Sequence, residues 1–199
     1  MKKFIIPVAL LLIGVTALQL WVTKDRTGQK NELEAIESPQ ESAVGGSFTL
    51  TDQDGNPRSD ADFRGRVMLV SFGYTHCPDI CPMTVSTLSK TLALLGDKSD
   101  RATAIFITVD PARDTSAALK DFLKNFNPPV IGLTGSEQQI KQVADAYKVY
   151  YARAETGGDA FDHSGYIYLM SPQGRFMRVF PYNAPESEIA HAVEAALRS

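Results

Sequence analysis

Residues 66–82 read RVMLVSFGYTHCPDICP, and they are the most informative part of the chain for its architecture. Its first nine residues form an almost continuous apolar run, which is typical of a strand buried on both faces of a sheet. The loop that follows ends at Pro82, and apolar residues then recur at helical spacing up to Leu95. The stretch therefore predicts a central strand that runs through a cysteine-containing loop into a helix.

The rest of the folded region alternates between strand and helix patterns. Strands are expected at residues 47–51, 104–109 and 130–133, helices at 115–126, 136–150 and 186–197, and a hairpin at 166–170 with 175–180. This order predicts an α/β fold with a central mixed sheet flanked by helices. The thioredoxin-like fold fits this order, although that fold hosts several unrelated functions.

The N-terminal region predicts a membrane anchor followed by a linker. An apolar run at residues 4–22 follows Lys2 and Lys3, and a helix of that length spans roughly the hydrocarbon core of a bilayer. The boundaries we predict are an anchor at 1–23, a polar linker at 24–46 and a folded domain at 47–199. The alternative is a cleaved signal peptide. Either segment exports the domain, and we expect it at the inner membrane on the periplasmic side.

The charge pattern excludes one class of partner. The chain has a formal net charge of −3, yet its first thirty residues are basic, so the remaining domain is clearly acidic. An acidic domain lacks the positive surface that nucleic-acid binding requires. We therefore expect no nucleic-acid partner.

The only two cysteines, Cys77 and Cys81, are each followed by proline. Pro82 fits best at the first helical position, so we expect Cys81 to cap the helix and both cysteines to be extended. The helix dipole is then expected to favour the Cys81 thiolate. Two sulfurs at this spacing can close a disulfide, cycle as a redox pair or clamp one metal ion. A structural staple and a peroxidase-like module are the less favoured alternatives.

A histidine is the natural third ligand, because two thiolates alone leave a Cu(I) or Zn site short of donors. His163 is expected in a loop that faces the cysteines in a thioredoxin-like fold. His76 should point away from Cys77, since neighbouring side chains alternate in direction. His191 lies on the exposed face of the last predicted helix. Of the three, His163 is the candidate ligand.

A second polar cluster, at residues 110–115, follows the next buried strand and should open at the same edge of the sheet. Asp114 is interpreted as the N-cap of the following helix. Asp110 or Arg113 is expected to steer charge or orientation at the sulfurs.

The sequence resembles the SCO/SenC family in its motifs at residues 71–82 (SFGYTHCPDICP), 109–115 (VDPARDT) and 162–164 (DHS). The resemblance implies a thioredoxin-like fold in which Cys77, Cys81 and His163 bind one copper ion, with Asp110 nearby. It also implies copper delivery to the dinuclear copper centre of cytochrome c oxidase subunit II, and an upstream copper donor or thiol reductant. Some relatives resemble thiol–disulfide reductases that keep the cysteines of that centre reduced. A Cys77–Cys81 disulfide and this reductase role therefore stay open.

Overall fold

The structure is a computed structural model that describes residues 44–154 and 161–198. The predicted anchor and most of the predicted linker lie outside the described residues. Ala43–Ser199 forms one compact unit. Among the helices that the structure describes, none has the length and apolar character needed to cross a membrane.

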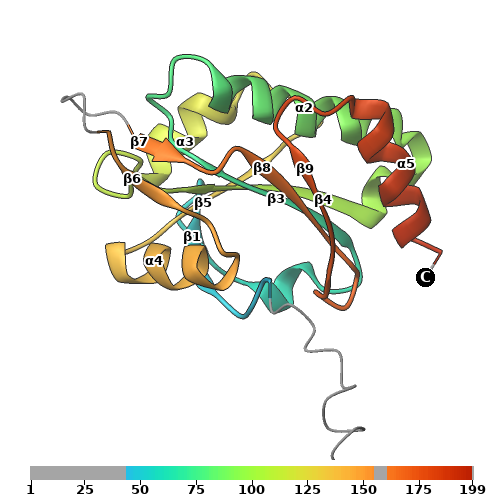
Figure 1. Cartoon of the computed structure of the whole chain (residues 1–199), viewed down its shortest axis with the longest axis horizontal. Coiled ribbons are helices and arrows are strands. Elements are labelled where there is room, and N and C mark those ends of the chain that lie inside the picture. Colours follow the sequence, from blue (N-terminus) through green and yellow to red (C-terminus); the bar gives the residue numbers. More distant parts are fainter. Residues whose placement is uncertain (1–43, 155–160, 199) are drawn as a thin grey trace, which may run out of the picture. The chain divides into compact units, whose positions relative to one another are not determined.

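The unit is built on a seven-stranded mixed sheet (Figure 1). Its spatial order is β2-β1-β5-β4-β3-β8-β9, in which β3, β4 and β5 are parallel and the remaining pairings are antiparallel. The strands are β1 (Thr49–Asp52), β2 (Pro57–Ser59), β3 (Val67–Gly73), β4 (Ala102–Thr108), β5 (Ile131–Thr134), β8 (Tyr166–Met170) and β9 (Phe176–Pro181). The predicted mixed sheet and the predicted hairpin, here β8 and β9, are confirmed.

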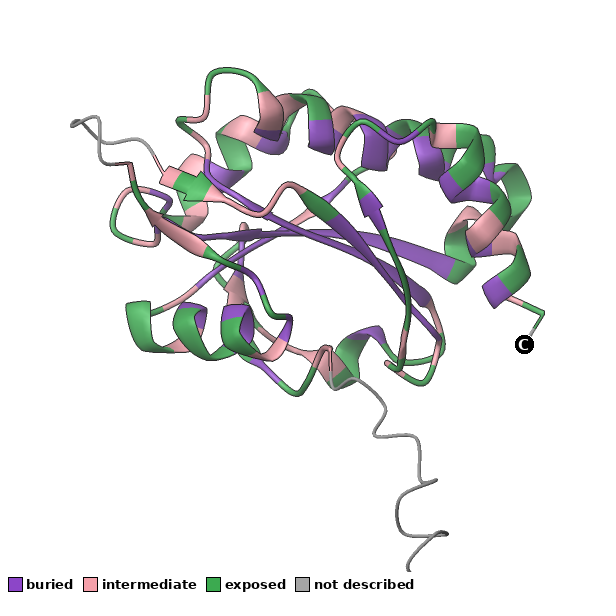
Figure 2. Cartoon of the chain, viewed as in Figure 1, coloured by how far each residue is buried: buried purple, intermediate pink, exposed green. Residues whose placement is uncertain are grey.

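The central strands bring two polar loops to one edge of the sheet. Every residue of β3 and β4 is buried, as the apolar runs predicted (Figure 2). The two strands pair from Val67 with Ala102 to Gly73 with Thr108, so their carboxyl ends are level. The cysteine loop after β3 and the loop at residues 109–115 after β4 therefore start side by side.

Helices cover both faces of the sheet (Figure 1). One face carries α2 (Ile80–Leu94), α3 (Ser116–Leu123) and α5 (Glu186–Ala196), and the other carries α4 (Glu137–Ala146). Two 3-10 helices, η1 (Asp60–Phe63) and η2 (Gly96–Arg101), complete the helical elements of the described residues. The helices turn their buried residues toward the sheet (Figure 2). This is the thioredoxin-like architecture that the order of elements predicted.

Local sequence explains where α4 begins and ends. Ser136 accepts a hydrogen bond from the backbone N–H of Gln139, and the Gln139 side chain accepts one from the N–H of Ser136. This reciprocal capping box fixes the first turn. The helix ends at Ala146, four residues before the predicted end, and Lys148 follows with a positive φ of 57°. A left-handed residue cannot continue a right-handed helix.

A second, two-stranded sheet stands apart from the main one. It pairs β6 (Tyr151–Arg153) with β7 (Phe161–His163) in antiparallel register, with Tyr151 opposite His163. His163 therefore ends a strand, where the sequence predicted a loop. Three-residue strands are too short to show an alternating pattern, which is why the sequence did not reveal this ribbon.

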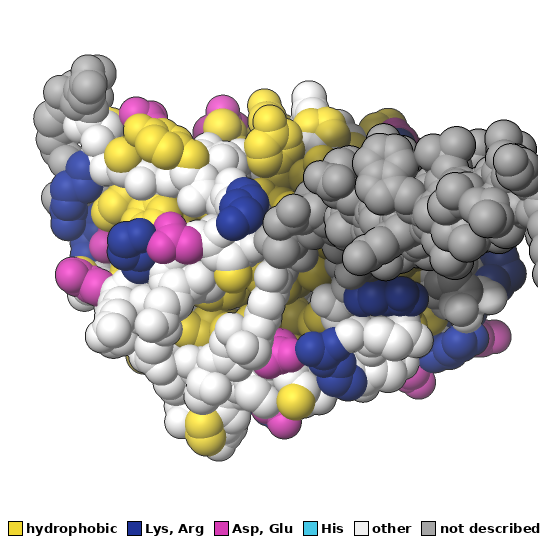
Figure 3. Space-filling model, turned by 60° about the horizontal axis from the view of Figure 1, so that its bottom comes forward, with side chains coloured by type: hydrophobic (Ala, Val, Ile, Leu, Met, Phe, Trp, Pro, Cys, Tyr) yellow, Lys and Arg dark blue, Asp and Glu magenta, His cyan; other side chains and the backbone are white. Residues whose placement is uncertain are grey.

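The α4 face of the molecule has no single dominant charge. Lys and Arg side chains are interspersed with Asp and Glu across the part of this face that the described residues form (Figure 3). No histidine side chain is visible on that part of the face.

Candidate metal centre

Three soft or borderline donor atoms meet at the carboxyl edge of the sheet. The Sγ atoms of Cys77 and Cys81 and a ring nitrogen of His163 all lie within 4.8 Å of one another. Cys77 comes from the loop after β3, Cys81 from the first turn of α2 and His163 from the end of β7. The structure thus brings together the three residues that the sequence analysis chose as ligands. A group of two thiols and an imidazole fits a soft metal ion such as Cu(I).

Helix α2 begins earlier than the sequence predicted. Asp79 occupies the N-cap position and Ile80 is the first helical residue, so Cys81 lies inside the first turn instead of capping it. The prediction that Cys81 is an extended cap is therefore wrong. Pro82 is tolerated as the third helical residue because backbone N–H groups of the first turn have no partner within the helix.

The two thiols sit in opposite electrostatic environments. Burial raises the pKa of Cys81 far above the ordinary thiol value, and the charges of Cys77 and Asp114 raise it further. Burial also raises the pKa of Cys77, but hydrogen bonds from the backbone of Asp79, Cys81 and Ile80 outweigh it and lower the pKa overall. The start of α2 therefore stabilises the Cys77 thiolate, whereas the sequence predicted this effect at Cys81.

Gly73, the last residue of β3, makes room for the Cys81 sulfur. A Cβ atom at this position would lie 2.7 Å from Cys81 Sγ and 2.7 Å from Cε2 of Phe106. Both distances are below any ordinary contact, so a side chain here would displace the sulfur or the ring. Glycine at the end of β3 therefore allows Cys81 to be buried against the sheet.

His163 presents one nitrogen to the cysteines. Its Nδ1 lies 3.3 Å from the carbonyl oxygen of Ser164, and its Nε2 lies 3.4 Å from Cys81 Sγ. We assign the proton to Nδ1, which donates to that carbonyl and leaves the Nε2 lone pair directed at the site. Burial lowers the pKa of His163, which favours the neutral form that binds metals.

Tyr74 supports His163 from the side of β3. Its ring meets the His163 ring edge-on, with centroids 6.0 Å apart and an interplanar angle of 82°. Its hydroxyl accepts a hydrogen bond of 3.3 Å from the backbone N–H of Phe161 at the start of β7. Tyr74 thus links the end of the central strand to the ribbon that carries the third donor.

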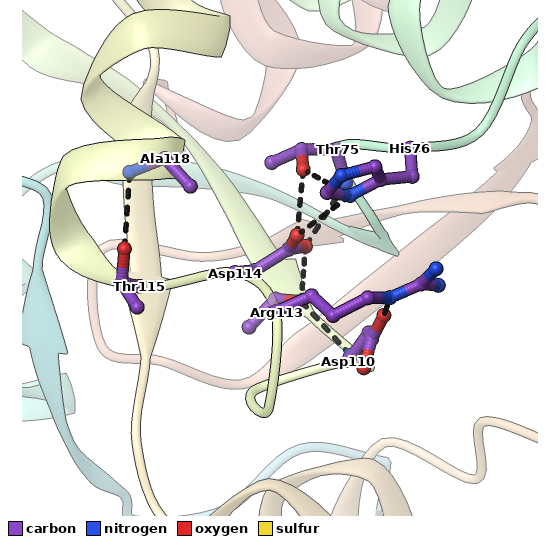
Figure 4. A network of polar contacts seen from close by, with 8 residues as sticks. Thr75, His76, Asp110, Arg113, Asp114, Thr115 and Ala118 are labelled. Atoms are coloured by element: carbon purple, nitrogen blue, oxygen red, sulfur yellow. Dashed lines mark hydrogen bonds and ion pairs between the residues drawn. The ribbon is translucent and has the colours of Figure 1, made fainter. Parts of the chain in front are cut away.

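A buried carboxylate holds the start of the cysteine loop (Figure 4). Asp114 accepts hydrogen bonds from the Thr75 N–H at 2.9 Å, from Thr75 Oγ1 at 2.6 Å and from Thr108 Oγ1 at 2.6 Å. The N-cap of α3 is instead Thr115, whose side chain accepts from Ala118 N–H. The interpretation of Asp114 as the cap is therefore wrong. Its side chain faces inward and accepts two hydrogen bonds from Thr75, whereas a cap position would offer it one donor.

Asp110 and Arg113 pair with each other. The Arg113 Nε donates to Asp110 Oδ2, and the Asp110 side chain is buried while Arg113 is partly exposed (Figure 4). Neither belongs to the group of three donors. Their predicted influence on the sulfurs stays a prediction.

The other two histidines lie outside the donor group. His76 is exposed, and its Nδ1 lies 3.0 Å from Thr75 Oγ1 and 3.7 Å from Asp114 Oδ1. His191 is exposed on α5. Both positions agree with the sequence analysis. Cys77 and Cys81 are free thiols in the structure, and a disulfide between them stays a prediction.

Comparison with known proteins establishes the family. The family model SCO1/SenC matches residues 36–198. The chain belongs to the SCO1/SenC family. The SCO2-like protein RC0895 of Rickettsia conorii is 39% identical over 190 residues, which cover 93% of this chain and 92% of that protein.

This SCO1/SenC protein is similar to two solved structures of Sco proteins. Bradyrhizobium japonicum ScoI with copper bound is 40% identical, with a TM-score of 0.71 over 78% of this chain and 100% of that one. BsSco, described as a Sco family member among cytochrome c oxidase assembly proteins and as having a disulfide switch, is 27% identical. Its TM-score is 0.67 over 78% of this chain and 94% of that one.

Sequence reasoning missed three residues that shape the centre of this SCO1/SenC protein. Gly73 carried a usable signal, because a glycine that interrupts a buried strand often marks a close approach. Tyr74 was read only as the end of an apolar run. Asp114 carried a misleading signal, since its place before a helix suggested a cap.

Proposed function

We propose that this protein is a membrane-anchored copper chaperone that delivers one copper ion to the dinuclear copper centre of cytochrome c oxidase subunit II. The observation that carries this function is the meeting of Cys77, Cys81 and His163 within 4.8 Å. The copper-bound ScoI structure, with 40% identity, supports copper as the cargo. The description of BsSco supports oxidase assembly as the setting.

The chemistry of the donors suits transfer as well as binding. Three ligands satisfy Cu(I) but leave space for a further donor from an acceptor. Cys77 and His163 are partly exposed, while Cys81 is buried. An incoming thiolate can therefore replace the accessible ligands first and the buried sulfur last. Stepwise exchange of this kind moves the ion without releasing it to solvent.

The location follows from the predicted anchor at residues 1–23. It would hold the domain on the periplasmic side of the inner membrane, beside membrane-embedded acceptors. An upstream copper donor would load the site, or a thiol reductant would keep the cysteines reduced, because only reduced sulfurs bind the ion.

The test is the copper content and coordination of the full chain, purified in mild detergent. We expect protein isolated without added metal to contain copper close to one per chain, and Cys81→Ser to lose it. His163→Ala should change the Cu(II) spectrum and weaken binding, whereas His191→Ala, at an exposed position on α5, should do neither. Unchanged Cu(II) affinity and spectrum in His163→Ala would refute the proposed coordination.

The difference between the two thiols favours a second candidate function, thiol–disulfide reduction. The Cys77 thiolate would attack a disulfide of the acceptor, form a mixed disulfide and release one acceptor thiolate. The Cys81 thiol, after losing its proton, would then attack Cys77, release the second acceptor thiolate and close a Cys77–Cys81 disulfide. Two electrons pass to the acceptor, and a dithiol reductant must restore the pair. This activity predicts exchange rates that His163→Ala leaves unchanged.

A further inference from the structure

An open groove lies directly beside the metal centre. Its volume is about 560 Å³, and its lining is mostly apolar or aromatic. The residues that matter for its chemistry are Ile80, Tyr150, Asp162, His163, Tyr166 and Tyr182. The groove thus combines segments from α2, the β6–β7 ribbon and the β8–β9 hairpin.

The groove and the metal centre share a wall. His163 lines the groove and is also the third candidate ligand. Ile80 also lines the groove, and it directly precedes Cys81 in α2. A segment seated in the groove would therefore lie against His163, one of the three donors, which is where an incoming ligand must arrive for exchange.

Exposed tyrosine side chains line the groove, and hydrogen bonds hold the backbone beside it in place. Tyr150 is 66% exposed and Tyr166 is 46% exposed. The Tyr150 N–H donates to Ser164 Oγ at 3.2 Å, and the Ser164 N–H donates to the Tyr150 carbonyl at 3.0 Å. Tyrosine is enriched among residues that dominate binding energy, and a preorganised site loses less entropy on binding. These features favour a protein segment as the occupant.

The negative charge of the groove indicates which kind of protein segment can bind there. Asp162 lines it, exposed Asp79 adjoins Ile80, and no Lys or Arg is among the described residues that form its lining. A second copy of this acidic domain would bring the same two carboxylates to the contact. Residues 31–42 of this chain contain four glutamates and no basic residue, so they too would meet like charge. An extended segment with an apolar centre and a Lys or Arg flank is complementary.

We propose that this tyrosine-lined groove is the docking site for the ligand-bearing segment of the copper acceptor. The inference rests on the proposed chaperone function and adds the surface and the chemistry of the partner segment. The tyrosines hold the apolar part of the segment, and the carboxylates attract its basic flank. Docking then places the acceptor's donors beside His163 and Cys77.

The test measures docking and transfer separately. The probe is the metal-free domain of cytochrome c oxidase subunit II that carries the copper centre, added to the copper-loaded full chain in nanodiscs. The variant is the double substitution Tyr150→Ser with Tyr166→Ser. The matched control is Leu94→Ser on α2, which removes a similarly exposed apolar side chain (59% exposed) away from the groove lining.

We expect the double variant to bind the probe at least about tenfold more weakly, as loss of interfacial hot spots does. Its Cu(I) affinity, measured by competition with a chelator, should match the wild type, and Leu94→Ser should match it in both assays. Higher salt should weaken wild-type docking.

Equal binding by wild type and double variant, or no binding by the wild type, would overturn the docking site. An equal loss of Cu(I) affinity and docking would also overturn it, because the tyrosines would then act on the metal centre. Conversion of a wild-type dimer to monomers by the double variant would assign the groove to self-association instead. Docking that depends on the tyrosines but yields no copper transfer would refute the chaperone function and leave the docking site standing.

Discussion

The carboxylate of Asp114 accepts two hydrogen bonds from Thr75, one from the Thr75 backbone N–H at 2.9 Å and one from the Thr75 hydroxyl at 2.6 Å. Thr75 lies two residues before Cys77, so this contact fixes the point at which the cysteine loop leaves the sheet. The same carboxylate also accepts from Thr108 in β4, and the residue is fully buried. The position of the first sulfur therefore depends on a side chain outside the donor group.

Asp114→Asn should destabilise the fold and weaken copper binding. An amide has one acceptor atom where the carboxylate has two, so at least one buried hydrogen bond is lost. Hydrogen bonds to charged groups contribute about 1.5–3 kcal/mol, and we expect the free energy of unfolding to fall by about 2 kcal/mol. Urea denaturation of the metal-free protein measures this, with exposed Asp121→Asn on α3 as the control. Equal stability of both variants would show that the contact to Thr75 contributes nothing.

Gly73→Ala should perturb the metal centre more than the fold. The added Cβ would lie 2.7 Å from Cys81 Sγ, so the sulfur must move or the strand must shift. Overpacking of this kind costs about 1–3 kcal/mol. We expect lower Cu(I) affinity in a chelator competition together with a reduced Tm. Gly46→Ala is the control, because its Cβ would meet only Ala146, at 3.3 Å. Normal affinity in Gly73→Ala would contradict the inferred close fit.

The two cysteines should differ in reactivity. The pKa of Cys77 lies below the ordinary thiol value because backbone N–H groups at the start of α2 outweigh its burial, whereas burial raises the pKa of Cys81. Thiolates are the reactive form, so iodoacetamide at pH 7 should modify Cys77 first and Cys81 only slowly. Peptide mapping by mass spectrometry of the reduced wild-type protein measures the order. Bound Cu(I) should protect both, and faster labelling of Cys81 would reverse our assignment.

The sequence predicted the parts of this protein that depend on pattern. The buried strands β3 and β4 followed from apolar runs, and the meeting of Cys77 and His163 followed from the expected thioredoxin-like fold. The details that failed depend on packing. Whether Cys81 caps α2 or lies within it is decided by burial against Gly73, and the role of Asp114 is decided by Thr75, 39 residues earlier. The sequence signal at Gly73 marks a close approach without identifying Cys81 as the neighbour, and short-range patterns do not contain the Asp114–Thr75 contact.

The stability of the metal-free protein should depend on His163 as the pH falls below about 6.5, the ordinary pKa of an imidazole. Burial lowers the pKa of His163 in the folded state below the ordinary value of 6.5, so the unfolded chain binds the proton more readily. As the pH falls through this range, protonation therefore favours unfolding, and the free energy of unfolding decreases. His163→Gln should remove this part of the pH dependence, while His191→Gln, at an exposed position, should retain it. Parallel urea titrations at pH 5, 6 and 7 measure the difference, and identical slopes for wild type and His163→Gln would contradict the burial of a neutral imidazole.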